Sequence, residues 1–268
     1  MALTPSSVQR ALAALLRDMP EVHRRWIFGH NSAPNWIGLP SQVIGNLVEL
    51  NVGDLAGLVN DGIPVAWVPR AKVLKKLISA DREDRRKLLL SHESVILDDC
   101  INVAHRIHNG ALAESAELLI EAASAARADY HSAAQALASN VLDTGLRITY
   151  PDRRRWYRSM ERFISDLQGD RELSNLRTGL ALAPVLLAIS EYDGRAAIPD
   201  SYNRHATAHG AGQLQYTRTN AIIAIMTASS ALRECYEQGR PREQYRGDPL
   251  VLLQLLYGFK GAPSARRA

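Results

Sequence analysis

The sequence has few of the residues that mark secreted, membrane-spanning or cofactor-dependent proteins. It contains only two cysteines, Cys100 and Cys235, which lie far apart in apolar or mixed helical surroundings. This pattern favours buried free thiols in a reducing cytoplasm over a disulfide framework. No stretch approaches the roughly 18 consecutive apolar residues of a membrane-spanning helix, and the first residues lack the pattern of a signal peptide. We therefore expect a cytoplasmic protein without a membrane segment.

Lysine is also scarce. The chain has five lysines, so 27 of its 32 basic residues are arginine. The net charge of +4 and the isoelectric point near 9.2 are mildly basic. Arginine binds phosphate well, but a GC-rich genome produces the same bias, so the composition gives only weak support for contact with nucleic acid. Phosphate loops, dinucleotide-binding fingerprints and nucleophile elbows are missing, and we predict no cofactor.

Strand patterns are nearly absent, because alternation of apolar and polar residues is confined to residues 63–68. Hydrophobic residues make up 46% of the chain and charged residues 22%, which is typical of a globular protein with a sizeable core. Apolar periodicity and capping residues predict helices, including a last long helix capped by Thr217 or Thr219. The expected helices cover residues 4–16, 41–60, 69–79, 81–108, 111–127 (with a continuation to 141 left open), 151–167, 170–189, 200–209, 217–237 and 249–259. The predicted fold is all-α.

The character of the chain changes near residue 80. Before it, short helical stretches alternate with turn-rich loops, and after it the helices are long and rich in alanine. We therefore predict an N-terminal helical region of unknown role at residues 1–80, a helical bundle at 81–260 and a flexible basic tail at 261–268.

One segment combines residues suited to phosphate chemistry. Arginine followed by histidine four to six residues later recurs in this chain, so the spacing of Arg204 and His209 alone does not single them out. Their surroundings do. Small residues separate the pair, Gly210 is placed to end a short helix, and the full segment is Asn203-Arg204-His205-Ala206-Thr207-Ala208-His209-Gly210. A histidine exchanges protons near neutral pH, and an arginine holds a phosphate through paired hydrogen bonds.

This segment and the helix start that follows it resemble the HEPN superfamily, the higher eukaryotes and prokaryotes nucleotide-binding domains. Many members carry an Asn-Arg-His/Asn-x-x-x-His-Gly segment, then a loop and a Thr-x-x-Asn-Ala helix start, which is matched here by Thr217–Ala221. The similarity covers residues 200–230, and it implies a HEPN-like helical bundle for residues 81–260.

The resemblance implies a metal-independent endoribonuclease, of the kind found in toxin–antitoxin and anti-phage defence systems. Arg204 and His209 would be catalytic, with Asn203 and His205 in support. RNA would be the substrate and an antitoxin or regulatory protein a further partner. Two side chains five positions apart on one helix, such as Arg204 and His209, point about 140° away from each other. A homodimer with a composite cleft is therefore expected, in which each copy contributes one of the two residues. The family also uses an acidic residue from another helix, for which four candidates remain open: Asp98, Asp99, Glu121 and Asp143.

Several other interpretations remain. Arg204 and His209 also have a purely structural interpretation, in which Arg204 pairs with a carboxylate and His209 is a helix-end histidine without a chemical role. The protein would then be a non-catalytic HEPN-like module that binds RNA, a nucleotide or a protein. His205 and His209 share the four-residue spacing of zinc ligands, but no glutamate and no third ligand motif accompany them, so we predict no metal. RNA-binding candidates outside the motif are Arg153, Arg154, Arg155, Arg158 and Arg218.

Overall fold

A computed structural model describes residues 57–108, 110–150, 173–189, 192, 197–210 and 212–238. Every regular element in this part of the chain is a helix, and residues 63–68 form no strand there, which confirms the all-α prediction. The helices expected at 4–16, 151–167 and 249–259, most of the one at 41–60, and the tail at 261–268 lie outside the described residues. None of the described helices is long and apolar enough to cross a membrane.

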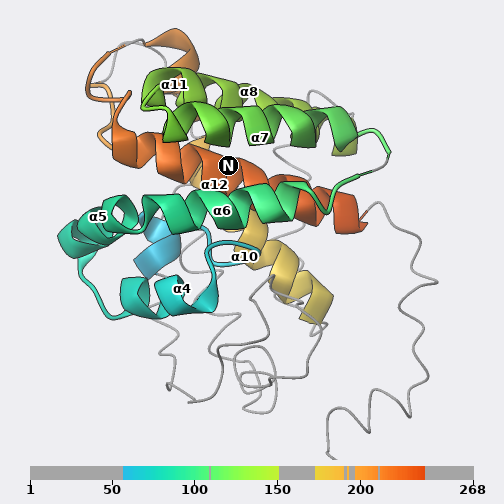
Figure 1. The fold of residues 1–268 in the computed structure, drawn as a ribbon, viewed down its shortest axis with the longest axis horizontal. Helices are drawn as coiled ribbons and strands as arrows, with labels where there is room; N and C mark the ends of the chain where they lie inside the picture. Colours follow the sequence, from blue (N-terminus) through green and yellow to red (C-terminus); the bar gives the residue numbers. More distant parts are fainter. Residues whose placement is uncertain are drawn as a thin grey trace, which may run out of the picture.

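Figure 1 shows the helices formed by the described residues. In chain order they are α4 (Ala71–Ile78), α5 (Arg82–Ser91), α6 (Glu93–Ala104), α7 (Ala113–Arg127), α8 (His131–Thr149), α10 (Leu173–Ala188), α11 (Arg204–His209) and α12 (Arg218–Gln238).

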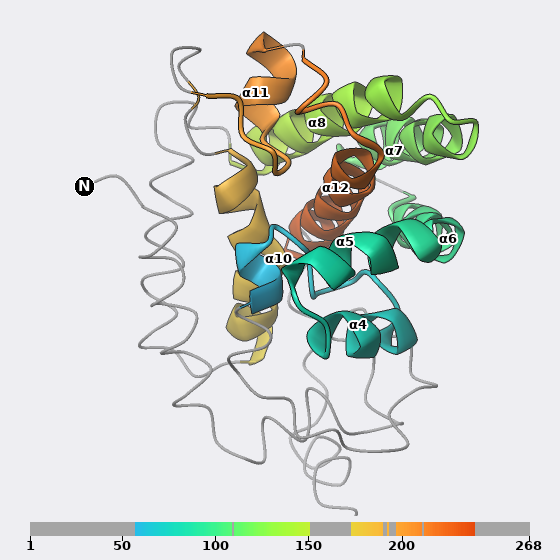
Figure 2. The same cartoon turned by 90° about the vertical axis from the view of Figure 1, so that its left-hand side faces the viewer.

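Helix α12 is the centre of the structure. Every residue from Asn220 to Leu232 is buried, so this helix has no solvent-facing side over more than three turns. It lies between α7 and α8 on one side and α5 and α6 on the other, with α10 alongside (Figures 1 and 2). Thr217 begins it, because the Thr217 hydroxyl oxygen accepts a hydrogen bond from the backbone N–H of Asn220 at 3.1 Å. This confirms one of the two capping residues that the sequence offered.

The structure decides the limits of two long helices predicted from the sequence. The single helix expected at residues 81–108 is wrong: the chain breaks at His92 (φ −112°, ψ 12°) into α5 and α6. The His92 ring lies within 3.0 Å of the Leu88 carbonyl and of the Lys76 ammonium, so it ties the break to α4. The next helix ends at Arg127, as predicted, and the continuation to residue 141 that the sequence left open does not occur, because the chain turns at Asp129 (φ 62°) into α8.

The described part of the predicted N-terminal region shares its core with the bundle. Leu58, Ile63 and Trp67 are buried in the same apolar cluster as α12. The Trp67 indole N–H donates to the Glu234 carboxylate at 3.0 Å, and the Ser230 hydroxyl donates to the Ala66 carbonyl at 2.8 Å. Residues 57–80 are therefore a packed part of the helical core.

Both thiols are free and buried, as the sequence predicts. Burial raises the pKa of Cys100 to about 12, and it does the same for Cys235. Both side chains therefore stay protonated at physiological pH and serve as small apolar groups.

The closest approach of α8 to α12 depends on Gly145. A Cβ atom at this position would lie 2.5 Å from Cδ1 of Leu232, which is itself only 1% exposed. Gly145→Val is therefore expected to lower the free energy of unfolding by about 1–3 kcal/mol through overpacking. Chemical denaturation measures this change. Thr144→Val places the same valine on the exposed side of α8, where it replaces a side chain that is already branched, and should leave stability nearly unchanged; equal losses in both variants would contradict the close helix contact.

Candidate functional site

Helix α11 is short, and local side-chain contacts define both of its ends. Asn203 has an extended backbone (φ −137°, ψ 124°), and its side-chain oxygen accepts from the N–H of Ala206 at 2.8 Å, so it is the N-cap. Gly210 is the C-cap, as expected, but its φ of −133° is not left-handed. A Cβ there would lie 3.1 Å from the Tyr192 ring and 3.3 Å from the Ala206 carbonyl, so close packing favours glycine at this position. Because Asn203 is only 5% exposed and caps α11, its role is to stabilise the helix that carries Arg204.

A polar stripe on α8 holds α11 in place. The stripe consists of Gln135, Ser139, Asp143 and Arg147, which are four residues apart and so share one face of the helix. The Gln135 amide donates to the Thr207 hydroxyl at 2.9 Å, and the Ser139 and Tyr202 hydroxyls share a hydrogen bond of 3.0 Å. Burial raises the pKa of Tyr202 to about 12, so this phenol stays neutral and serves as an anchor.

Gln215 completes the attachment from the loop between α11 and α12. Its side-chain oxygen accepts from the N–H of Asn203 at 2.9 Å, and its amide donates to the carbonyls of Pro199 and Ser201, both at 3.0 Å. The Asn220 amide adds bonds to the carbonyls of Asp200 and Gln215. Because Gln215 and Asn220 are fully or nearly fully buried, these bonds form away from competing water. The backbone that leads into Arg204 is thereby fixed from both sides.

Arg204 makes an ion pair with Asp143, the third residue of the polar stripe. Their nearest side-chain atoms are 3.2 Å apart, and both side chains are mostly buried, at 16% and 18% exposure. Asp143 also accepts from the Arg147 guanidinium at 2.7 Å, so one carboxylate lies against two arginines. The excess positive charge and the partly buried position suit the binding of an anion at this point.

The structure separates the four acidic candidates. Asp143 is the one that contacts Arg204. Asp99 binds Arg70, the residue before α4, and Asp98 binds Arg127 on the surface. Glu121 lies on the exposed side of α7. The sequence contains a signal that would have favoured Asp143, namely its place in the four-residue stripe that begins with Gln135.

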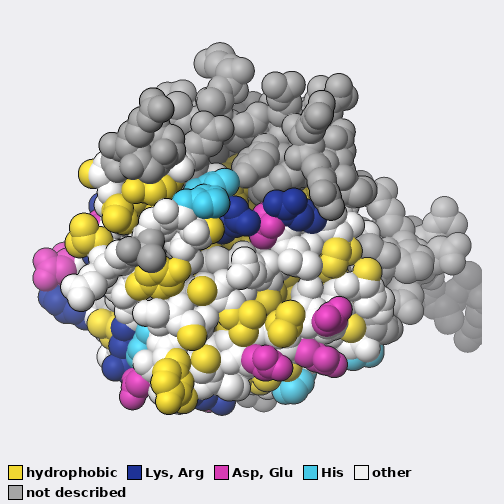
Figure 3. All heavy atoms as spheres, turned by 90° about the horizontal axis from the view of Figure 1, so that it is seen from above, with side chains coloured by type: hydrophobic (Ala, Val, Ile, Leu, Met, Phe, Trp, Pro, Cys, Tyr) yellow, Lys and Arg dark blue, Asp and Glu magenta, His cyan; other side chains and the backbone are white. Residues whose placement is uncertain are grey.

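His209 lies in the last turn of α11 and is exposed. Among the described residues, none donates a hydrogen bond to its ring or accepts one from it. The rings of His205 and His209 are stacked, with centroids 6.2 Å apart and planes 24° from parallel. Figure 3 shows histidine, arginine and acidic side chains next to one another on the surface over α8 and α11. Within the described ranges, no group of three or more potential metal ligands is found.

Arg218 is attached to a different part of the bundle. Its guanidinium binds the carboxylate of Glu93, whose other oxygen lies 3.1 Å from the His131 ring. The hydrogen bond to Glu93 raises the pKa of Arg218. This cluster joins the first turns of α6, α8 and α12, so Arg218 has a structural partner although half of its side chain is exposed. The other RNA-binding candidates, Arg153, Arg154, Arg155 and Arg158, lie outside the described residues.

Sequence reasoning missed Gln135 and Gln215, which decide how α11 is attached. Gln135 is detectable in retrospect, because it occupies an apolar register of α8, seven residues before the buried Leu142. Gln215 lies in a polar loop, and nothing in the sequence distinguishes it from its neighbour Gln213.

Comparison with known proteins adds no relative to this picture. No protein-family model, no curated protein and no solved structure that was compared matches the chain. What the site does is therefore inferred from the chemistry of its own residues.

Proposed function

We propose that this protein is a metal-independent endoribonuclease of the HEPN type, with Arg204 and His209 as its catalytic residues. The observation that supports this best is that α11 carries a fixed arginine at one end and an exposed histidine at the other. Arg204 is held in a fixed, partly buried position by Asp143, whereas His209 is exposed and has no hydrogen-bond partner among the described residues. Phosphodiester transesterification needs proton transfer and stabilisation of a charged phosphorane; an accessible His209 can act as the base or the acid, and a fixed Arg204 can stabilise the charge.

The reaction begins with attack of a ribose 2′-oxygen on the adjacent phosphorus. A base removes the 2′-hydroxyl proton as the new O–P bond forms, and an acid gives a proton to the departing 5′-oxygen as the old P–O bond breaks. The products are a 2′,3′-cyclic phosphate and a free 5′-hydroxyl. Arg204 stabilises the additional negative charge on the phosphorane oxygens. Atoms and charge balance without a metal ion or another co-reactant.

The short length of α11 supports a site shared between two copies. Arg204 and His209 are at opposite ends of this six-residue helix and about 140° apart around its axis. A homodimer that brings two α11 helices together would let the arginine of one copy and the histidine of the other face one phosphate. Light scattering tests this part separately, because a fully active monomer at micromolar concentration contradicts it.

The cellular role that fits this activity is a cytoplasmic toxin or anti-phage defence effector, restrained by an antitoxin or regulatory protein. This part of the proposal rests on the resemblance of residues 200–230 to HEPN proteins. One observation favours the alternative, a non-catalytic HEPN-like binding module: the guanidinium of Arg204 already has a carboxylate partner.

RNA cleavage in EDTA decides between the two. The purified wild-type chain is expected to cut RNA and leave 2′,3′-cyclic phosphate ends, and to leave a fully 2′-deoxy substrate intact. His209→Ala is expected to lose this activity, because the proton-transferring group is gone. His105→Ala is the matched control, since His105 is an exposed histidine at the end of α6. RNA that stays intact with wild type contradicts the nuclease and leaves the binding module, whereas equal cutting by all three proteins contradicts the assignment of cleavage to His209.

A further inference from the structure

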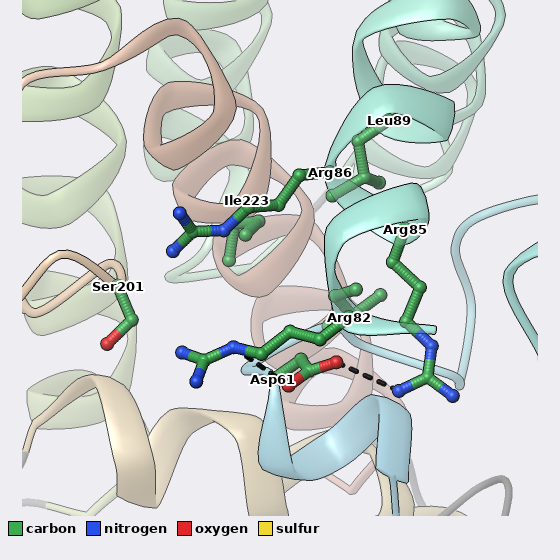
Figure 4. A pocket seen from close by; sticks show the side chains of 8 residues that line it. Asp61, Arg82, Arg85, Arg86, Leu89, Ser201 and Ile223 are labelled. Atoms are coloured by element: carbon green, nitrogen blue, oxygen red, sulfur yellow. Dashed lines mark hydrogen bonds and ion pairs between the residues drawn. The ribbon is translucent and has the colours of Figure 1, made fainter. Parts of the chain in front are cut away.

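A second cluster of arginines lies outside the candidate nuclease site, in a hollow between α5, the first turns of α12 and the segment around Ser201 (Figure 4). Three arginines of α5 line it: Arg82, Arg85 and Arg86. Leu89 and Ile223, both nearly or fully buried, form an apolar wall.

The three arginines are not equivalent. Arg85 is only 11% exposed, donates to the Asp61 carboxylate at 2.8 Å and to the Leu77 carbonyl at 3.0 Å, and points away from Ser201. It is a fixed part of the wall, and Asp61 neutralises it. Arg82 and Arg86 are 61% and 40% exposed, and Figure 4 shows their guanidinium groups extending toward the side where Ser201 lies. Two guanidinium groups opposite a hydroxyl form a donor set suited to a tetrahedral oxyanion.

Asp200 is the present counter-ion of these two groups. Its carboxylate lies 3.2 Å from Arg86 and 3.9 Å from Arg82, and its side chain is 66% exposed. Ion pairs that are this exposed are weak, because water and salt compete for both charges. A phosphate offers more charge and more acceptor oxygens than a carboxylate, so it is able to displace Asp200.

The charges of the neighbouring residues leave the hollow positive. Asp61 also touches Arg82 at 3.4 Å, but its closer partner is Arg85. The other acids in the first turn of α5, Glu83 and Asp84, pair with Lys87. At the hollow itself, three arginines therefore face two carboxylates, Asp61 and Asp200, which leaves one positive charge; Glu83 and Asp84 share the single charge of Lys87.

We propose that Arg82, Arg86 and Ser201 form a phosphate-binding site, in which the Asp200 carboxylate occupies the place of the phosphate when none is bound. The ligand is a phosphate group, either free or within a nucleic-acid strand. The site is joined to the segment before Arg204, because Asn220 holds the Asp200 carbonyl and Gln215 holds the Ser201 carbonyl. Phosphate binding does not depend on the proposed nuclease activity.

The test of this site is a calorimetric titration of the full chain with inorganic phosphate at low salt. Arg86→Gln is expected to raise the Kd about tenfold or more, since a charge-assisted contact is lost. Asp200→Asn is expected to lower it roughly threefold, since the competing carboxylate is gone. Two controls carry the same changes in net charge elsewhere: Lys87→Gln on the same helix and Asp98→Asn, whose partner is Arg127. Neither control should change the Kd.

The source of the phosphate is tested with an uncleavable DNA oligonucleotide. If its binding follows the same variants and inorganic phosphate competes with it, the ligand is a strand phosphate; if only inorganic phosphate follows them, it is a free anion. Absence of phosphate binding to wild type, or equal effects of the site variants and their charge-matched controls, overturns the proposal. The two proposals fail separately: cleavage that persists in His209→Ala contradicts the nuclease site, and a phosphate Kd that changes equally in Arg86→Gln and Lys87→Gln contradicts this site.

Discussion

Replacing Arg204 by glutamine is expected to reduce the rate of RNA cleavage by about 10²–10³-fold, the usual cost of removing one preorganised donor from a charged transition state. The pairing with Asp143 explains why the effect should be large. A guanidinium held by a carboxylate at 3.2 Å does not have to be ordered again when the phosphorane forms. Single-turnover cleavage of a labelled RNA measures the chemical step directly.

Arg147 provides the matched control for Arg204. It binds the same carboxylate, but its side chain is 45% exposed and it lies on α8 instead of α11. Arg147→Gln should change the rate only a few-fold, as expected for loss of a peripheral charge. Arg204→Lys keeps the charge and loses the planar fork, so it should restore only part of the rate. Equal rates for wild type and Arg204→Gln would remove Arg204 from the catalytic residues.

Folding should survive the loss of Arg204. Asp143 keeps Arg147 as a partner, so the substitution does not leave a buried carboxylate without a counter-ion. A normal unfolding curve for Arg204→Gln would therefore assign the lost cleavage to chemistry. A large loss of stability would instead support the structural interpretation of Arg204.

The second large effect is expected at Gln215. Gln215→Leu removes the acceptor of the Asn203 N–H and the donors to the Pro199 and Ser201 carbonyls. Each buried group left without a partner costs about 1–3 kcal/mol, so the free energy of unfolding should fall by about 3 kcal/mol or more. Urea denaturation measures the loss.

Gln213→Leu is the control for Gln215, because it makes the same change two residues earlier at an exposed position. Its effect should stay within about 0.5 kcal/mol of zero, as is usual for surface substitutions. If Gln215→Leu were as mild as Gln213→Leu, then the buried polar network would not be what attaches α11 to the bundle.

The sequence by itself determined the features that depend on neighbouring residues. It predicted an all-α chain, the start of α12 at Thr217 or Thr219, and the end of a short helix at Gly210, because caps and apolar periodicity act within one or two turns. It also predicted two buried free thiols. These features are stabilised by contacts between residues at most a few positions apart.

Only the tertiary structure decided which distant residues meet. The break at His92 lets α6 pack along α12 while α5 packs beside α4. No strong helix breaker marks this position in the sequence. Four acids were equal candidates for Arg204, and packing of α8 against α11 selected Asp143, 61 residues away in the chain. The four-residue spacing from Gln135 places Asp143 on a polar face of α8, but which element that face meets depends on how whole helices pack. The same packing placed Arg82 and Arg86 beside Asp200, where the sequence alone indicated no site.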